Sequence, residues 1–197
     1  YDDIMLRFID WLKKGKYTAT GVTFDCGTTV QRAIQEYIKN KDIEKCGRDK
    51  VTDNGNGSLM RIAPISLYVI DGLEVKNGVN VELDMNIVNK VRKASRITHA
   101  HEISQDACLI YTFLLWFIIN IGPRSEQNKS FIHCLNLTLG YLTHYNLIDL
   151  SKFNLLKDAK YLCMRATEDE IISSSYVVDT LEASIWCLAN SNSFSEA

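Results

Sequence analysis

A glycine-containing segment near the N-terminus has the residue types of an anion cradle. Residues 18–29, with the sequence TATGVTFDCGTT, carry Gly21, Gly27 and the acid Asp25 directly before an apolar stripe of helical spacing. Glycine lets the backbone approach a phosphate closely, and the amides that open a helix direct partial positive charge at it. The spacing matches neither Walker A nor GxGxxG, so packing of a capped turn is the alternative interpretation.

A second glycine-rich segment follows at residues 53–64, with the sequence DNGNGSLMRIAP. Ser58 is placed to cap a helix, and the amides of the preceding Asn-Gly-Asn-Gly turn are candidates to hold the phosphate or ribose hydroxyls of a ligand. Pro64 indicates either a kink or a new helix with proline in its first turn. Turn formation alone explains the same composition equally well.

Two histidines stand at the polar entry to the most hydrophobic stretch of the chain. His99 and His101 belong to residues 95–102, SRITHAHE, and no third histidine or cysteine is near them in the sequence. Two ligands do not make a metal site, so hydrogen bonding at a helix entry is the favoured role. His133 and His144 lie among apolar residues, where an ordinary core or surface histidine is expected.

The last polar cluster, residues 173–182 with the sequence SSSYVVDTLE, begins a helical pattern. Asp179 and Glu182 share one helix face and are compatible with a carboxylate pair, but an acidic first turn that complements the helix dipole explains them more simply. Tyr176 at the helix start is suited either to stacking on a base or to packing. A Ser-His-Asp or Cys-His nucleophile has no supporting spacing.

Helices must position these four clusters, because almost every periodic segment has apolar residues three or four apart. The stripes are Ile4, Phe8 and Leu12; Val30, Ala33, Ile34, Tyr37 and Ile38; Leu83, Ile87, Val88 and Val91; Leu155, Leu156, Ala159, Leu162 and Cys163; and Val178, Leu181, Ile185, Leu188 and Ala189. Thr28 and Thr29 are predicted to cap the second of these helices. Only residues 79–83 have an ambiguous strand pattern, so the sequence predicts an all-α fold in one domain, residues 1–197.

The composition is that of a globular domain without a general attraction to polyanions. In 197 residues, 22 Lys and Arg stand against 24 Asp and Glu, and the formal net charge of −2 predicts no binding to nucleic acid or to an anionic membrane. The apolar run at residues 107–121 is shorter than the roughly 20 residues that cross a bilayer, so it predicts a buried core helix. The six cysteines form no CxxC pair; most are expected to be reduced core thiols, which favours a cytoplasmic protein.

Taken together and in this order, the clusters resemble the ADP-ribosylglycohydrolase family. Residues 9–11 and 17–29 resemble its tryptophan helix and the TG..FD.G..T loop that follows, and residues 55–64 resemble its GNGSLMR..P segment. THAH at residues 98–101 is similar to the family's TH.H element, and YVVDTLEA at residues 176–183 is similar to a family helix. The resemblance covers practically the whole chain and implies an orthogonal all-α bundle.

This resemblance implies a hydrolase that removes ADP-ribose from a modified protein side chain or a small acceptor by cleaving the glycosidic bond. It also implies that Asp25 is the catalytic or substrate-contacting acid. The implied substrate-binding residues are Gly21, Gly27, Thr28, Asn56, Gly57, Ser58, His99 and Tyr176. Tyr176 is expected to stack near adenosine. The family often has Asn in place of Thr28 and Gly in place of Ser175, so the local ligand geometry is expected to differ.

The family's enzymes use two Mg²⁺ ions as cofactors, held by an N-terminal Glu and T-D-D motif and a C-terminal G-D-x-D-T motif. Neither motif occurs in this sequence. Asp2 and Asp3 lie only eight residues before Asp10-Trp11, whereas the family's metal-binding aspartates lie a further helix upstream. We therefore expect the chain to be the central part of a larger domain, without metal ligands of its own, and weakly active or inactive alone.

Two other functional classes stay open at this point. A non-catalytic module or degenerate paralogue would keep ADP-ribose or nucleotide binding without the metal centre, whereas a helical scaffold for protein partners would have no nucleotide affinity. The resemblance implies an ADP-ribosylated protein or an ADP-ribose derivative as the partner. These residues do not decide between arginine, serine and O-acetyl acceptors, and they say nothing of the oligomeric state.

Overall fold

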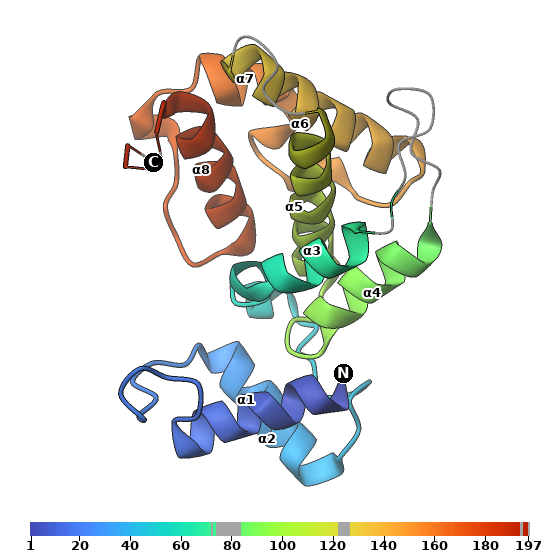
Figure 1. Cartoon of the computed structure of the whole chain (residues 1–197), viewed down its shortest axis with the longest axis vertical. Helices are drawn as coiled ribbons and strands as arrows, with labels where there is room; N and C mark the ends of the chain where they lie inside the picture. The colour runs from blue at the N-terminus through green and yellow to red at the C-terminus, as the bar shows by residue number, and fades with distance from the viewer. Residues whose placement is uncertain (72, 74–83, 122–126, 194, 197) are drawn as a thin grey trace.

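The computed structural model of the chain describes residues 1–71, 73, 84–121, 127–193 and 195–196 (Figure 1). These residues form eight α-helices and no named β-strand, so the predicted all-α class is confirmed. The helices are α1 (Asp2–Lys14), α2 (Thr28–Asn40), α3 (Ala63–Ile70), α4 (Met85–Arg96), α5 (Glu102–Ile121), α6 (Gln127–His144), α7 (Ala159–Met164) and α8 (Val177–Asn190). Short 3-10 helices are η1 (Val51–Asp53), η2 (Leu59–Arg61), η3 (Leu150–Lys152), η4 (Leu156–Asp158) and η5 (Glu168–Glu170).

Helix α5 is the centre of the larger of two hydrophobic cores. Helices α3, α4, α6 and α8 contact it, and its residues from Ala107 to Ile110 are completely buried (Figure 1). By length and composition, α5 is apolar enough to cross a membrane, but 72% of its most apolar stretch is buried inside the molecule. The predicted core helix at residues 107–121 is therefore confirmed for the side chains that are described.

A smaller core holds α1 and α2 together at one end of the molecule, where Figure 1 shows them side by side. Met5, Ile34, Tyr37, Cys46 and Ile97 form its buried part. Because apolar side chains every three or four residues make one stripe on each helix, two short helices can bury a common seam. The six cysteines are free thiols, and four of them are buried, as expected.

The starts of two helices differ in how well the sequence predicts them. The predicted N-caps Thr28 and Thr29 are wrong: Gly27 is the N-cap of α2, and no side chain caps it. Both threonines already have helical backbone, so their hydroxyls cannot occupy the capping position. Helix α3 has Pro64 in its first turn, which confirms a new helix rather than a kink. Leu83 and the ambiguous stretch at residues 79–83 lie outside the described residues.

Gly15 allows the chain to turn back closely after α1, and this turn leads into the first glycine segment, residues 18–29. Its φ is 62°, and a Cβ added there would lie 1.8 Å from the Gly21 carbonyl oxygen. We predict that Gly15→Ala lowers the free energy of unfolding by about 2 kcal/mol or more, measured by urea denaturation. Gly140→Ala, with open space at an exposed site in α6, is the matched control and is expected to raise stability by about 0.5–1 kcal/mol. Equal effects of the two substitutions would contradict the close approach.

Candidate functional site

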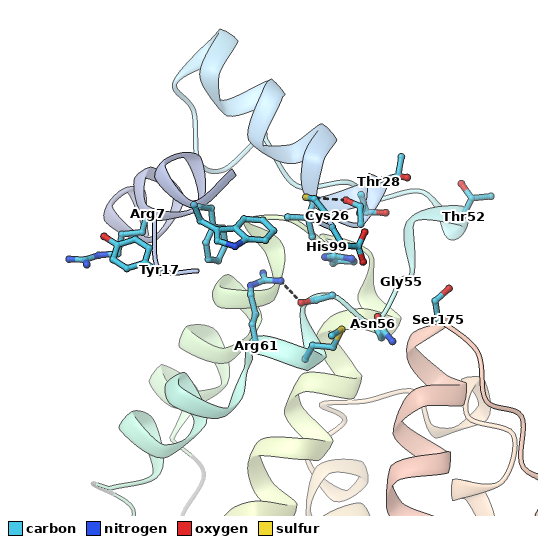
Figure 2. A pocket seen from close by; sticks show the side chains of 18 residues that line it. Arg7, Tyr17, Cys26, Thr28, Thr52, Gly55, Asn56, Arg61, His99 and Ser175 are labelled. Carbon is cyan, nitrogen blue, oxygen red and sulfur yellow. Dashed lines mark hydrogen bonds between the residues drawn. The ribbon is translucent and has the colours of Figure 1, made fainter. Parts of the chain in front are cut away.

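A cavity of about 980 Å³ lies between the α1–α2 layer and the larger core (Figure 2). Its walls come from α1, the loop that leads into α2, residues 52–61, His99 and Ser175. This volume is at the upper end of the range for small-molecule sites. The aromatic side chains of Phe8, Trp11 and Tyr17 line one side, and glycine backbone lines another.

Most of the residues that the sequence singled out as substrate-binding or catalytic face this cavity. Asp25, Gly27, Thr28, Asn56, Gly57 and His99 line it. Gly21, Ser58 and Tyr176 do not. Gly21 is exposed with a φ of 74°, Ser58 is fully buried below the loop, and Tyr176 is half-buried against the larger core. The cavity thus brings both glycine segments and the TH.H element together. The backbone at Tyr176 forms a bridge with that of Gly55, which lines the cavity.

Two short backbone bridges link the second glycine segment, and the chain just before it, to distant parts of the sequence. The Arg48 amide donates to the Thr98 carbonyl at 2.9 Å, and the Ala100 amide donates to the Arg48 carbonyl at 2.7 Å. Further along, the Asn56 amide donates to the Ser175 carbonyl at 2.9 Å, and the Val177 amide donates to the Asn54 carbonyl at 3.0 Å. These four bonds place motifs that are far apart in sequence at one site.

The buried side chain of Asn54 also holds the second glycine segment in place, a role that the sequence did not predict. Asn54 is 2% exposed; its Nδ2 donates to the Val51 carbonyl at 3.1 Å, and its Oδ1 accepts from Ser104 Oγ at 2.9 Å. Asn54 Nδ2 also lies 3.0 Å from His101 Nδ1. His101 is therefore a hydrogen-bonding histidine at the entry to α5, as the sequence predicts.

His99 lies against the glycine backbone and is held neutral. Its Nδ1 is 2.8 Å from Thr98 Oγ1, and a Cβ added to Gly57 would lie 3.0 Å from His99 Cε1. Burial, and to a smaller extent the nearby charge of Arg61, lower the pKa of His99 to about 3. At neutral pH the imidazole is therefore an uncharged hydrogen-bonding group.

Arg61 also lines the cavity, and its position within the GNGSLMR segment is the sequence signal that points to it. Its Nη1 donates to the Gly57 carbonyl at 2.9 Å, as Figure 2 shows, and its Nη2 donates to the Ala94 carbonyl at 2.9 Å. Burial lowers the pKa of the guanidinium to about 10, so it stays charged at neutral pH. The ring of Phe8 covers it, with the centroid 5.4 Å from Cζ.

Asp25 is the single carboxylate among the described residues that line the cavity, and its side chain is exposed. Within the residues that the structure describes, no group of three or more His, Cys, Asp or Glu is placed to hold a metal ion. A two-Mg²⁺ centre therefore does not fit these residues. Asp2 accepts a hydrogen bond from the Tyr37 hydroxyl at 2.7 Å, and Asp3 pairs with Arg7 outside any such cluster.

The two acids of the C-terminal cluster do not form a carboxylate pair. Asp179 accepts from Ser174 Oγ at 2.6 Å. Glu182 is 4% exposed and accepts from the amides of Leu155 and Leu156 at 2.7 and 3.0 Å. Burial raises the pKa of the Glu182 carboxyl, and the two amides act in the opposite direction. Glu182 thus holds the start of η4 against α8.

Fold and site together define an all-α domain with a ligand cavity built from glycine backbone, the half-buried guanidinium of Arg61 and one exposed acid. The chain belongs to the ADP-ribosylglycohydrolase family, whose model matches residues 1–197. It is 28% identical over 192 residues to the ADP-ribosylarginine hydrolase Tri1 of Serratia proteamaculans (strain 568), covering 97% of the chain and 44% of that relative. It is 24% identical over 189 residues to the ADP-ribosylarginine hydrolase Tri1 of Pseudomonas putida (strain GB-1), covering 96% and 43% respectively. The chain thus spans less than half the length of these relatives.

The hydrogen bonds of Asn54 give a prediction for stability. Asn54→Asp keeps the shape but removes both Nδ2 hydrogens and buries a negative charge, so we expect the free energy of unfolding to fall by about 2–4 kcal/mol in urea denaturation. The matched control Asn154→Asp, at an exposed position, is expected to change it by less than about 0.5 kcal/mol. Similar values for both variants would show that the loop does not depend on Asn54.

The neutral state of His99 gives a prediction for pH. Between its folded pKa of about 3 and its ordinary value of 6.5, the unfolded state binds more protons than the folded state. This contribution to stability is complete above pH 6.5 and is lost as the pH falls toward 3. We expect the stability advantage of the native chain over His99→Gln to shrink by roughly 1.4 kcal/mol per pH unit below pH 6.5 in urea titrations.

The control for this experiment is His133→Gln, which removes a histidine at an exposed site. The prediction is wrong if the native chain is more stable than His99→Gln by the same amount at pH 7.5 and at pH 5. His99 would then be protonated equally in the folded and unfolded states.

Proposed function

We propose that the cavity binds an ADP-ribosyl group and that the protein hydrolyses the glycosidic bond between ADP-ribose and a modified protein side chain. The observation that carries the proposal is the convergence of both glycine segments and His99 on one cavity of ligand size. The names of the two relatives favour arginine as the modified side chain. An ADP-ribosylated protein is accordingly the proposed partner.

The residues around the cavity suit a diphosphate and the two riboses that it joins. No side chain caps the start of α2, so amides of its first turn are available to an anion beside Gly27 and Thr28. The Gly57 backbone approaches without a side chain, and neutral His99 adds a hydrogen-bonding group that needs no counter-ion. These features support recognition of a nucleoside diphosphate sugar.

Asp25 is the proposed acid of the reaction. Hydrolysis of a glycosidic bond passes through an oxocarbenium-like state, and a carboxyl group next to the ribose carbon can move a proton to the leaving group or from water. Asp25 is exposed at the cavity, where a bound ribose and water can reach it. Mg²⁺ dependence is proposed for the whole protein only, with ligands other than the residues described here.

A second candidate function is a binding module that recognises ADP-ribose without turnover. The observation that favours it is the single carboxylate among the described residues of the cavity, since glycosidases ordinarily use two. Both candidates predict the same binding and differ only in hydrolysis.

Binding and turnover separate these candidates. We expect calorimetry to show ADP-ribose binding to the chain, and Gly57→Ala to weaken it at least tenfold, because the added Cβ would lie 3.0 Å from His99 and 3.2 Å from Val30. With the full-length protein and an ADP-ribosylated arginine substrate in Mg²⁺, Asp25→Ala is expected to lower kcat by about 10²-fold or more.

The matched control is Asp49→Ala, which removes an exposed carboxylate outside the cavity and is expected to leave both measurements unchanged. ADP-ribose binding without hydrolysis by the full-length protein supports the binding module. No binding of ADP-ribose by the chain or by the full-length protein would refute both candidates.

A further inference from the structure

Arg61 carries a half-buried positive charge without a carboxylate partner among the residues that the structure describes. Its contacts are all carbonyl oxygens: Gly57 and Ala94 at 2.9 Å and Ser95 at 3.4 Å. The other arginine of the cavity wall, Arg7, differs because it pairs with Asp3 at 2.9 Å and is largely exposed. Arg61 is therefore the cation of this wall whose charge its neighbours leave uncompensated.

The carbonyls that Arg61 holds belong to the two segments that meet at the cavity floor. Gly57 is in the second glycine segment, whereas Ala94 and Ser95 are in the last turn of α4. That turn leads directly to His99, whose amide donates to the Ser95 carbonyl at 2.9 Å and whose carbonyl accepts from Ser95 Oγ at 3.0 Å. One planar guanidinium thus fixes the spacing between the glycine backbone and the histidine.

The surroundings of Arg61 stabilise the guanidinium but do not neutralise it. The last turn of a helix has partial negative charge, and the ring of Phe8 faces the cation at 5.4 Å. These are dipolar and quadrupolar contacts, so a full positive charge stays beside the cavity. An anion that enters the cavity supplies the missing counter-charge next to a half-buried guanidinium, where the attraction is larger than at a fully exposed surface.

We propose that Arg61 is a positioning residue for anion recognition: it clamps the Gly57 carbonyl to the last turn of α4 and presents a fixed positive charge to a phosphate in the cavity. The ligand that this arrangement suits is a nucleoside diphosphate derivative, and naming it rests on the proposed function. The anion preference itself rests on the contacts of Arg61 alone. A planar two-armed donor is required, because a lysine ammonium cannot reach both segments with the same geometry.

The experiment compares Arg61→Gln and Arg61→Lys with the native chain by calorimetry, using ADP-ribose, inorganic diphosphate and adenosine as probes at two salt concentrations. Arg61→Gln is expected to weaken ADP-ribose and diphosphate binding about 30-fold and adenosine binding less than threefold, and to reduce the salt dependence. Arg61→Lys is expected to keep part of the salt dependence and to weaken ADP-ribose binding about threefold to tenfold. The matched control Arg96→Gln removes an exposed charge from the same end of α4 and is expected to change none of these values.

A purely structural role of Arg61 makes a different prediction. Adenosine and ADP-ribose binding would then fall by the same factor, with unchanged salt dependence, and this result would overturn the proposal, as would unaltered ADP-ribose binding in Arg61→Gln. If thermal unfolding shows that Arg61→Gln does not fold, the ratio of ADP-ribose to adenosine affinity in Arg61→Lys decides the question in the same way.

Different results would refute the proposed role of Arg61 and the proposed function of the protein. Diphosphate binding by the native chain, with no ADP-ribose binding by the chain or by the full-length protein, would refute the function and support the anion site. No binding of either probe by the chain or by the full-length protein would refute both.

Discussion

The site depends on one constraint: a loop that offers bare backbone to a ligand must be fixed by contacts outside itself. The Asn-Gly-Asn-Gly sequence gives residues 54–57 little side-chain packing, and ordering each residue costs about 1–2 kcal/mol of backbone entropy. The buried Asn54 side chain and the two backbone bridges at Arg48 and Asn56 supply the compensating contacts. Apart from Val51, these partners lie more than 40 residues away in the sequence, so local contacts alone do not fix the loop.

The second constraint is the close approach of the two cores around the cavity. A Cβ added to Gly47 would lie 1.7 Å from the Arg96 carbonyl oxygen, so the chain that leaves the α1–α2 layer passes directly over the end of α4. Ile97 follows α4 and belongs to the smaller core, whereas Ala94 belongs to the larger one. The end of α4 is thus shared by both cores, and each core supports one wall of the cavity beside it.

Patterns within the sequence predict the helices and the motifs but not the partners of buried polar groups. The stripes at Ile34 and Ile185 have local periodicity, which fixes a helix and its buried face without knowledge of any contact. Asn54, Arg61 and Glu182 each have a hydrogen-bond partner that lies 26 to 50 positions away, and no local signal distinguishes them from turn or surface residues. The error at Thr28 has a related cause: a threonine next to a glycine fits either capping or the first helical turn, and the packing of α2 decides between them.

The charge of the cavity is a local property that the composition of the chain conceals. A net charge of −2 gives no overall attraction to an anion. Around the cavity, however, the half-buried guanidinium of Arg61 and the uncapped start of α2 are positive, and His99 is uncharged at neutral pH. Since water screens exposed charges far more than buried ones, these few groups outweigh the acidic surface at the distance of a bound ligand. A weakly acidic protein can in this way hold a site that selects anions.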